Sequence, residues 1–434
     1  MVKPNKELKN WYYHRDLINY YAFNLTPQCS ILNIHHGNDI FRDSLKYKNY
    51  KSVNISKKSI FPDKKFDFIF ISDSLSVVRD IQSLFHKLKK CSSPNTRLIV
   101  NYHNYFWLPF LKIAVKLGIK DPQKYTNWLN TDDVINLLSI ENYQIIKVGQ
   151  RLLIPVYIPV ISYFINRYIA YFPVINKLCF TNYLISRPVN DNKIYDQTVS
   201  VIIPVRNESG NIENTIKRLP KLGKHTEIIF IEGYSSDNTW DKIIRVQNKY
   251  KKLDIKVFKQ QGIGKADAVR LGFIKARGNI LMILDADLTV PPEELTKFYE
   301  AINKDKGEFI NGCRLVYPVQ KEAMQFLNTV ANHLFSTILS WILNIKIKDT
   351  LCGTKVISKK NYLHIARNRK YFGDFDPFGD FDLIFGAAKL NLKYTEIPIH
   401  YQSRKYGHTN ISRFKHGWLL LKMTIFALFK LKFV

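Results

Sequence analysis

A strand and a pair of acids are encoded together in Asn279-Ile-Leu-Met-Ile-Leu-Asp-Ala-Asp-Leu-Thr-Val-Pro-Pro292. The apolar run Ile280 to Leu284 follows Gly278, which is typical of a strand covered on both faces by helices in a parallel α/β sheet. Ligands of such sheets bind at the carboxyl ends of the strands. The sequence therefore predicts a ligand site around Asp285 and Asp287.

These two aspartates are consistent with two roles. Residues i and i+2 of a strand point the same way, so Asp285 and Asp287 can share one hard divalent cation, Mg²⁺ or Mn²⁺, that keeps positions open for phosphate oxygens. Alternatively, the two acids cap the helix that Pro292, Glu293 and Glu294 signal. The spacing alone leaves both roles open, and the flanking motifs are needed to choose.

The composition indicates a globular, strongly basic protein. The 434 residues are 46% hydrophobic and include 28 Phe and 25 Tyr, which excludes a disordered polypeptide and allows two domains. Lys and Arg outnumber Asp and Glu by 65 to 36, and the net charge of +29 predicts anionic partners such as nucleic acid, a nucleotide or a phospholipid surface. Because the lysines are scattered and no zinc-finger spacing occurs, we expect no specific nucleic acid partner.

The cysteines and the first residues bear on the cellular compartment. The 5 cysteines are odd in number and widely spaced, which predicts reduced thiols in a cytosolic compartment. Met1 to Asn10 is polar and lysine-rich, with no apolar stretch behind it, so we expect no cleaved signal peptide.

The amino-terminal part alternates strand-like runs with helical patterns between Ser30 and Leu153. That alternation predicts a parallel sheet. The strand-like runs are Ile31–Ile34, Val53–Ile55, Phe66–Ile71, Leu98–Asn101 and Gln144–Leu153.

The stretches Phe66 to Leu75 and Ser93 to Val100 resemble the middle of a class I S-adenosylmethionine-dependent methyltransferase. The resemblance covers residues 20–155 and implies a Rossmann-like domain, which we assign to residues 1–185.

Two features depart from the methyltransferase pattern. The cofactor loop, Asn33 to Asp39, has one glycine where the family has several. Asn54 or Ser56 stands where the family has an acid that holds the ribose. Active methylation and a docking scaffold are therefore both open for this domain.

Residues 152–184 are rich in apolar and aromatic side chains. Pro155 and Pro159 interrupt the first part and Arg167 and Lys177 bracket the second, so neither is long enough to span a membrane. The segment is expected either to lie in a membrane interface or to pack between two domains. Residues 186–197 are polar and are expected to form the linker.

Three motifs precede the aspartate pair in the second half of the chain. They are the strand and polar loop Thr198–Glu213, the strand and turn Glu227–Thr239, and the glycine-lysine loop Gly262–Gly272. In this order, followed by Asp285-Ala-Asp287, they resemble the family-two glycosyltransferases with a GT-A fold. The turn departs from the family, because Glu232 and Gly233 stand where two aspartates are usual.

This resemblance implies an enzyme that uses a nucleotide sugar and a divalent metal, Mg²⁺ or Mn²⁺, held by Asp285 and Asp287. The residues implied to bind the nucleotide sugar are Pro204, Arg206, Asn207, Glu208, Glu232, Lys265, Asp267, Asp285, Ala286, Asp287 and Arg404.

Within the family, residues 198–411 look most like the polyprenyl-phosphate (dolichol-phosphate) mannosyl- or glucosyltransferases. The strand Gly312–Leu315 and the turn Asp349–Lys355 imply that Arg314 and Lys355 bind an acceptor phosphate. Lysine replaces the usual arginine at 355, which gives up bidentate geometry.

The last part of this resemblance covers a helix start and a closing loop. Asp382 aligns with the acidic residue of the helix start, and Arg404 with an arginine of the loop that closes on the donor diphosphate. Asn410 stands where that loop has a lysine, for which Arg413 or Lys415 is expected to compensate.

The implied function is transfer of a hexose, with inversion, from a GDP-mannose or UDP-glucose type donor to a polyprenyl phosphate. The implied catalytic residues are Asp287, Asp382 and Arg404. Asp382 orients the substrates if the acceptor is a phosphate and is the candidate base if the acceptor is a saccharide or glycoconjugate hydroxyl. A methyltransferase with an inert second domain is a competing class, and a nucleic-acid or membrane-surface binding protein without catalysis, suggested by the charge of +29 and the aromatic apolar segments, is another.

Two apolar stretches of the second half concern a membrane. Residues 322–345 have near-helical apolar spacing and are expected to form an amphipathic hairpin. The last helix, which we place in residues 412–434, combines Trp418 with Lys422, Lys430 and Lys432, as an interfacial anchor does, although a core helix is the alternative. We therefore expect a peripheral or monotopic protein at the cytoplasmic face of a membrane.

Overall fold

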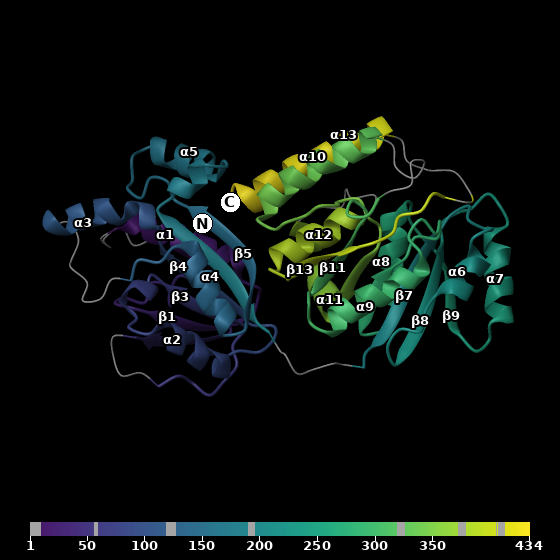
Figure 1. Cartoon of the computed structure of the whole chain (residues 1–434), viewed down its shortest axis with the longest axis horizontal. Helices are drawn as coiled ribbons and strands as arrows, with labels where there is room; N and C mark the ends of the chain where they lie inside the picture. Colours follow the sequence, from purple (N-terminus) through teal and green to yellow (C-terminus); the bar gives the residue numbers. More distant parts are fainter. Residues whose placement is uncertain are drawn as a thin grey trace. The chain divides into compact units, whose positions relative to one another are not determined.

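The computed structural model describes residues 10–55, 60–118, 127–189, 196–318, 326–371, 379–404, 406 and 413–434. Ser56, Asn410 and the first residues of the predicted 322–345 segment lie outside these ranges. The chain divides into two compact units (Figure 1). Unit 1 comprises residues 1–191 and 431–434, and unit 2 comprises residues 192–430.

Unit 1 is built on a six-stranded sheet with the order β2-β1-β3-β4-β6-β5. The first four strands are parallel, and β6 is antiparallel to both β4 and β5. The prediction of an α/β unit is confirmed. Each predicted strand-like run lies inside an observed strand or extends beyond it by at most two residues. The strands are β1 (Ser30–His35), β2 (Asn49–Asn54), β3 (Phe68–Ser72), β4 (Arg97–His103), β5 (Tyr143–Arg151) and β6 (Thr181–Pro188).

Helices cover both faces of this sheet. Alternate residues of β3 point to opposite sides, so Ile69 and Ile71 pack in one apolar cluster while Phe68 and Phe70 pack in the other. The helices of unit 1 are α1 (Trp11–Asn24), α2 (Ile81–Leu88), α3 (Leu108–Lys116), α4 (Thr131–Ile140) and α5 (Ile161–Arg167), with short 3₁₀ turns η3 (Tyr105–Trp107) and η5 (Ile175–Leu178).

Strand β6 corrects two predicted boundaries. It takes Thr181–Pro188, which were divided between the apolar segment 152–184 and the linker 186–197. Both edges of β6 are paired, with β4 on one side and β5 on the other, so residues such as Leu184 and Ser186 are fully buried. The end of the apolar segment is therefore part of the core.

Unit 2 is built on a seven-stranded sheet with the order β13-β11-β12-β10-β7-β8-β9. Strand β10 lies near the middle, parallel to β7 and antiparallel to β12. The predicted strand Ile280–Leu284 is confirmed to within one residue. The strands are β7 (Thr198–Val205), β8 (His225–Glu232), β9 (Asp254–Lys259), β10 (Ile280–Ile283), β11 (Phe309–Cys313), β12 (Lys355–Ser358) and β13 (Tyr394–Pro398).

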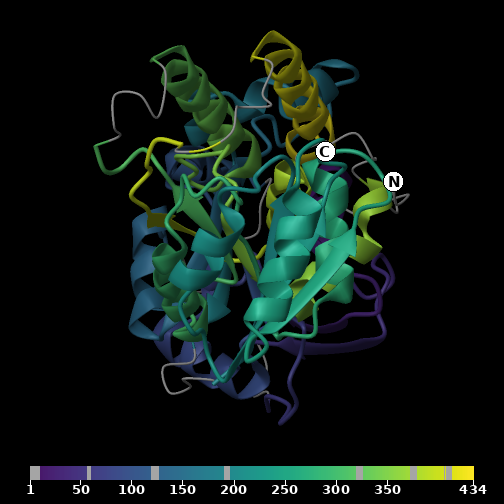
Figure 2. The same cartoon turned by 90° about the vertical axis from the view of Figure 1, so that its right-hand side faces the viewer.

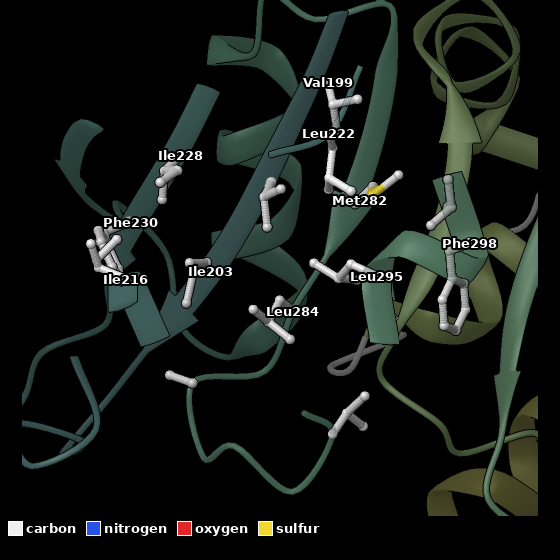
Figure 3. Close-up of a cluster of buried hydrophobic side chains, with 14 of the residues drawn as sticks. Val199, Ile203, Ile216, Leu222, Ile228, Phe230, Met282, Leu284, Leu295 and Phe298 are labelled. Carbon is white, nitrogen blue, oxygen red and sulfur yellow. The ribbon is translucent and has the colours of Figure 1, made fainter. Parts of the chain in front are cut away.

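The core of unit 2 follows the same alternation. Figure 3 shows Val199, Ile203, Met282 and Leu284, which lie in one apolar cluster with Phe298. On the other face, the helix α8 (Lys265–Lys275) approaches β7 closely at Gly272, where a Cβ atom would lie 2.5 Å from Cγ2 of Ile202. The helices are α6 (Ile212–Arg218), α7 (Thr239–Lys249), α8 (Lys265–Lys275), α9 (Leu295–Asn303), α10 (Phe326–Leu343), α11 (Lys359–Arg367), α12 (Asp380–Lys389) and α13 (Arg413–Ala427).

Helices α10 and α13 lie side by side (Figures 1 and 2). Over its described residues the predicted hairpin is one continuous helix, α10. In each helix one side is buried and another is exposed, as Leu339 and Leu334 illustrate in α10, and Met423 and Trp418 in α13. In the part of the chain that the structure describes, no helix is long and apolar enough to cross a membrane.

Candidate active site

The candidate site lies at the carboxyl ends of β7, β8 and β10. These three strands are parallel, so the segments that follow them meet at one edge of the sheet. The segments carry Asn207 and Glu208 after β7, Gly233 after β8, and the Asp285–Asp287 pair after β10. Residues that are far apart in the sequence are thereby brought to one place.

Asp285 forms an ion pair with Lys265, the first residue of α8. The Lys265 Nζ atom lies 2.6 Å from Oδ1 of Asp285, and both side chains are about a quarter exposed, at 26% and 28%. Burial disfavours the charged form of Asp285, but the charge and hydrogen bond of Lys265 outweigh it and hold the pKa of Asp285 below its usual range. The pair is therefore ionised near neutral pH.

Gly353, in the segment before β12, packs directly against this ion pair. A Cβ atom at position 353 would lie 2.0 Å from Oδ2 of Asp285 and 2.5 Å from Nζ of Lys265. No side chain fits there without displacing the pair. The sequence motif contained Gly353, but its contact with Asp285 depends on the approach of β12 to β10 and had no signal in the sequence.

Asp287 is held from two sides. Its Oδ1 atom accepts hydrogen bonds from the backbone N–H and the hydroxyl of Thr289, at 3.1 and 2.8 Å. Its Oδ2 atom accepts one from Nη2 of Arg404 at 2.7 Å. Leu288, between Asp287 and Thr289, has a φ of 55°, and this backbone conformation is strained for a residue with a side chain. The turn thus fixes the direction of the Asp287 carboxylate.

Arg404 also binds Glu208, so it joins the segment after β13 to the loop after β7. Its Nη1 atom donates to Oε1 of Glu208 at 2.9 Å, and Oε2 of Glu208 accepts from Asn211 at 2.7 Å. Burial raises the pKa of Glu208, and the charge of Arg404 opposes that shift. The sequence placed Glu208 and Arg404 in one site but did not predict their contact.

Tyr406 extends the same closure. Its hydroxyl lies 2.9 Å from Oγ of Ser209. Its ring packs against Gly210 so closely that a Cβ atom at position 210 would lie 2.6 Å from Cδ2 of Tyr406. Arg404 and Tyr406 therefore cover the second half of the loop between β7 and α6, at Glu208, Ser209 and Gly210.

Glu232 and Asn207 brace the turn after β8. Glu232 is 5% exposed and its Oε1 atom accepts from the backbone N–H of Ser235 at 2.5 Å. Asn207 has a φ of 56°, and its Oδ1 atom accepts from the N–H of Ser236 at 2.8 Å. Both predicted donor-binding side chains thus hold loop backbone in place.

The other predicted donor-binding residues have varied surroundings. Arg206 is exposed, Pro204 is partly buried at the end of β7, and Ala286 is buried between the two aspartates. Asp267 accepts from the N–H of Gly262 at 2.8 Å, which orders the loop ahead of α8.

Arg314 and Lys355, the predicted acceptor-phosphate residues, are both paired inside unit 2. Arg314 donates from Nε and Nη2 to the two carboxylate oxygens of Asp349, at 2.7 and 2.8 Å. Burial raises the pKa of Asp349, but Arg314 outweighs it and lowers that pKa to about 2. Lys355 is 1% exposed, lies 2.9 Å from Oδ1 of Asp380 and donates to the carbonyl of Cys352. A phosphate has to compete with these partners, and the acceptor assignment stays a prediction.

Asp382 lies in the first turn of α12 and is 7% exposed. Its Oδ2 atom lies 2.5 Å from Nη2 of Arg270 and 3.2 Å from Nε of Arg369. These contacts hold α12 against α8 and against the 3₁₀ turn η7 (Arg369–Tyr371) that follows α11, which is a structural role. The predicted catalytic role of Asp382 stays untested.

The donor set of Asp285 and Asp287 fits a divalent cation. Among the residues that the structure describes, no group of three or more His, Cys, Asp or Glu side chains is arranged to hold a metal. Two carboxylates suffice, however, for an ion such as Mg²⁺ that takes its remaining ligands from water and substrate phosphates. Lys265 and Arg404 already touch the same two carboxylates, so any ion bound there would share them.

Comparisons with known proteins bear on this site. Residues 200–364 match the model of the family described as Glycosyl transferase family 2. This match confirms the prediction of a glycosyltransferase domain and includes all the predicted site residues except Asp382 and Arg404.

Two curated relatives carry more specific names. The dolichol-phosphate mannosyltransferase of Pyrococcus furiosus is 38% identical over 120 residues, which are 27% of this chain and 33% of that protein. The dolichyl-phosphate beta-glucosyltransferase of Saccharomyces cerevisiae is 29% identical over 233 residues, 48% of this chain and 67% of that protein. The chain thus spans about a third of the first relative's length and two thirds of the second's.

A solved structure is also similar. Glucosyl-3-phosphoglycerate synthase from Mycobacterium tuberculosis, in complex with Mn²⁺, UDP and glucosyl-3-phosphoglycerate, covers 54% of this chain and 80% of its own, with a TM-score of 0.41 and 16% identity.

Proposed function

We propose that this chain is an inverting glycosyltransferase with a GT-A type domain, which moves a hexose from a nucleotide sugar of the GDP-mannose or UDP-glucose type to a polyprenyl-phosphate lipid. One observation carries the proposal. Asp285 and Asp287 lie at a sheet edge within the residues that match family 2, and each is ion-paired with a basic residue from a different segment, Lys265 or Arg404. A cluster of this kind suits the diphosphate of a nucleotide sugar.

Lys265 and Arg404 are available to a donor diphosphate. Each is 26% exposed, and each donates to a carboxylate that a diphosphate oxygen resembles in charge and geometry. The pKa of Lys265 is raised because Asp285 and Asp380 outweigh the effect of burial, so the amine stays charged at neutral pH. Both cations are expected to turn from their aspartates towards the ligand.

The proposed reaction breaks the bond between the anomeric carbon and the diphosphate oxygen, and a bond to the acceptor oxygen forms. The electron pair leaves on the diphosphate, and Lys265 and Arg404 stabilise the charge that grows there while the sugar becomes oxocarbenium-like. A divalent cation on Asp285 and Asp287 would supply Lewis-acid neutralisation of the same oxygens. A phosphate monoester is largely ionised near neutral pH, so no general base is required.

The names of the two curated relatives support a lipid phosphate acceptor, as do the exposed apolar sides of α10 and α13. We place the chain at the cytoplasmic face of a membrane, as a peripheral or monotopic protein. Arg314 and Lys355 are the proposed acceptor-phosphate contacts, and each must exchange its internal carboxylate for the phosphate.

The internal pairing of these two residues favours one second candidate, transfer to a saccharide or glycoconjugate hydroxyl. In that case Arg314 and Lys355 stabilise the fold only, through Asp349 and Asp380. A hydroxyl acceptor needs a general base, and Asp382 would have to act from between Arg270 and Arg369.

The test is incubation of the full chain with isotope-labelled nucleotide sugars and membrane lipid extract. Lipid phosphate transfer moves the label into the organic phase, in a form released by mild acid. Label that stays in the aqueous phase, on an added saccharide, would establish the second candidate instead.

For unit 1 we propose a docking scaffold in place of methylation. The polar side chains of the loop expected to hold S-adenosylmethionine are bonded within unit 1. Asp39 accepts hydrogen bonds from Asn33 at 2.9 Å and from the Tyr50 hydroxyl at 2.5 Å. Calorimetry of the full chain with S-adenosylmethionine is expected to show no binding, and tight binding would establish the methyltransferase alternative.

A further inference from the structure

Unit 1 exposes large apolar side chains in two segments, residues 105–117 and 156–178. Between residues 10 and 189, all the exposed large apolar side chains that the structure describes belong to these segments, except Ile60 and Ile140. Exposed apolar residues scattered singly are ordinary, but a contiguous set marks an interaction surface.

The two segments are joined into one surface, which we call the apolar surface. Asn104 Nδ2 donates to the carbonyls of Lys177 and Cys179, at 2.7 and 2.9 Å. Trp107 Nε1 donates to the carbonyl of Leu178 at 2.9 Å. These bonds fix η3, at the start of α3, to the end of η5, so the apolar side chains of both segments are presented together.

Helix α5 in this surface has its polar side turned inwards. Ser162 is fully buried, and its hydroxyl donates to the carbonyl of Val156 and accepts from the N–H of Ile158, at 2.8 and 2.7 Å. The neighbours Tyr163 and Phe164 are 48% and 54% exposed. A surface helix in water has the opposite arrangement, so α5 is built for an apolar medium.

Two strained turns project valine side chains from the same surface. Val160 and Val174 each follow a proline, have φ angles of 63° and 72°, and are 80% and 73% exposed. Positive φ is unfavourable for a β-branched residue, and so is an exposed apolar side chain in water. Contacts inside unit 1 do not account for valine at either position.

The charges of the surface are all positive. Residues 104–118 and 152–180 contain no Asp or Glu, whereas they contain Lys112, Lys116, Arg167 and Lys177. The Arg167 guanidinium lies over the ring of Tyr163, 5.6 Å from its centroid. Aromatic side chains beside lysine and arginine are typical of segments in the interface of a membrane with anionic lipid.

From these observations we infer that unit 1 has a membrane-docking surface of its own, residues 105–117 and 156–178, that inserts apolar side chains of α3, α5 and the two Pro-Val turns into an anionic bilayer interface. The inference does not depend on the sugar-transfer reaction, and vesicle binding is measured without nucleotide. Failure of either proposal therefore leaves the other standing.

The first experiment measures binding of the full chain to phosphatidylcholine vesicles with and without phosphatidylserine. The full chain is required because residues 431–434 belong to unit 1. The double variant Val160→Gly/Val174→Gly should keep the fold, since glycine adopts positive φ freely, yet bind at least about tenfold more weakly through the loss of two apolar side chains. The control is Ile140→Ser, which removes an exposed apolar side chain outside the surface and should leave binding unchanged. Equal binding by the parent and the double variant would overturn the inference.

The second experiment tests the charge and the depth of insertion. Lys112→Gln/Lys116→Gln should lower the preference for anionic vesicles about fivefold per lysine. The five cysteines, Cys29, Cys91, Cys179, Cys313 and Cys352, are buried, so Phe164→Cys can be labelled selectively with an environment-sensitive dye. Vesicles should shift the dye emission to the blue. An unchanged emission, or a dimer that the double glycine variant dissociates, would contradict membrane docking and assign the surface to water or to a second copy of the chain.

Discussion

Arg404 donates to Asp287 at 2.7 Å, across 117 residues of sequence. The same guanidinium reaches Glu208, so one side chain links the acid after β10 to the loop after β7. Because these three residues form one charged cluster, a change at any of them is expected to affect donor use more than stability.

Asp287→Asn should lower turnover by orders of magnitude while the protein remains folded. The amide keeps its size and can still accept from Thr289, but it no longer supplies a charge for Arg404 or for a divalent cation. Steady-state kinetics and thermal unfolding measure the two effects. The matched control is Asp241→Asn, an exposed acid on α7, and an active Asp287→Asn enzyme would exclude Asp287 from the chemistry.

Gly353→Ala should impair donor binding although it adds one methyl group. The new Cβ atom would meet Asp285 Oδ2 at 2.0 Å, so the Asp285–Lys265 pair must move. Calorimetric titration with GDP or UDP, with Mn²⁺ present, reports the loss. Gly417→Ala, where nothing lies within 4 Å, provides the control, and equal nucleotide affinity in all three proteins would show that the pair tolerates displacement.

The acceptor role of Arg314 requires a double variant. Arg314→Ala alone would leave Asp349 buried without its partner and would cost about 3–5 kcal/mol of stability. Arg314→Gln/Asp349→Asn removes both charges together. If Arg314 binds the lipid phosphate, the KM for polyprenyl phosphate should rise about ten- to a hundredfold, since a charge-assisted hydrogen bond contributes about 1.5–3 kcal/mol. Nucleotide affinity should stay constant, and an unchanged KM would leave Arg314 a purely structural role.

The Arg314–Asp349 pair should also make stability depend on pH. The pKa of Asp349 is about 2 when the protein is folded, which is below the value of about 4 for an unfolded aspartate. The pair therefore contributes about 3 kcal/mol at neutral pH, and that contribution is lost as the pH falls through about 4 to about 2. Urea unfolding at pH 7, 4 and 3 measures the loss. The double variant should lose less stability over this range than the parent, and parallel curves would contradict the assignment.

Local pattern was sufficient for the elements nearest the site. The apolar run before Asp285 predicted β10 to within one residue, because a buried strand needs a continuous apolar stretch whatever lies around it. The order of the loops after β7 and β8 predicted which polar residues reach the sheet edge, since parallel strands bring their carboxyl ends together. Pattern was insufficient for β6, whose identity as a strand depends on pairing with β4 and β5.

The sequence by itself thus determined that acids and bases gather at the end of β10 in a glycosyltransferase domain. The tertiary structure alone decided how they pair. In the structure Arg404 forms ion pairs with both Asp287 and Glu208. Lys355 was predicted from the sequence to bind a phosphate, but in the structure it forms an ion pair with Asp380 and only 1% of its side chain is exposed. Charge and spacing are local properties of a sequence, whereas an ion pair between distant residues depends on the path of the whole chain and on which groups water can still reach.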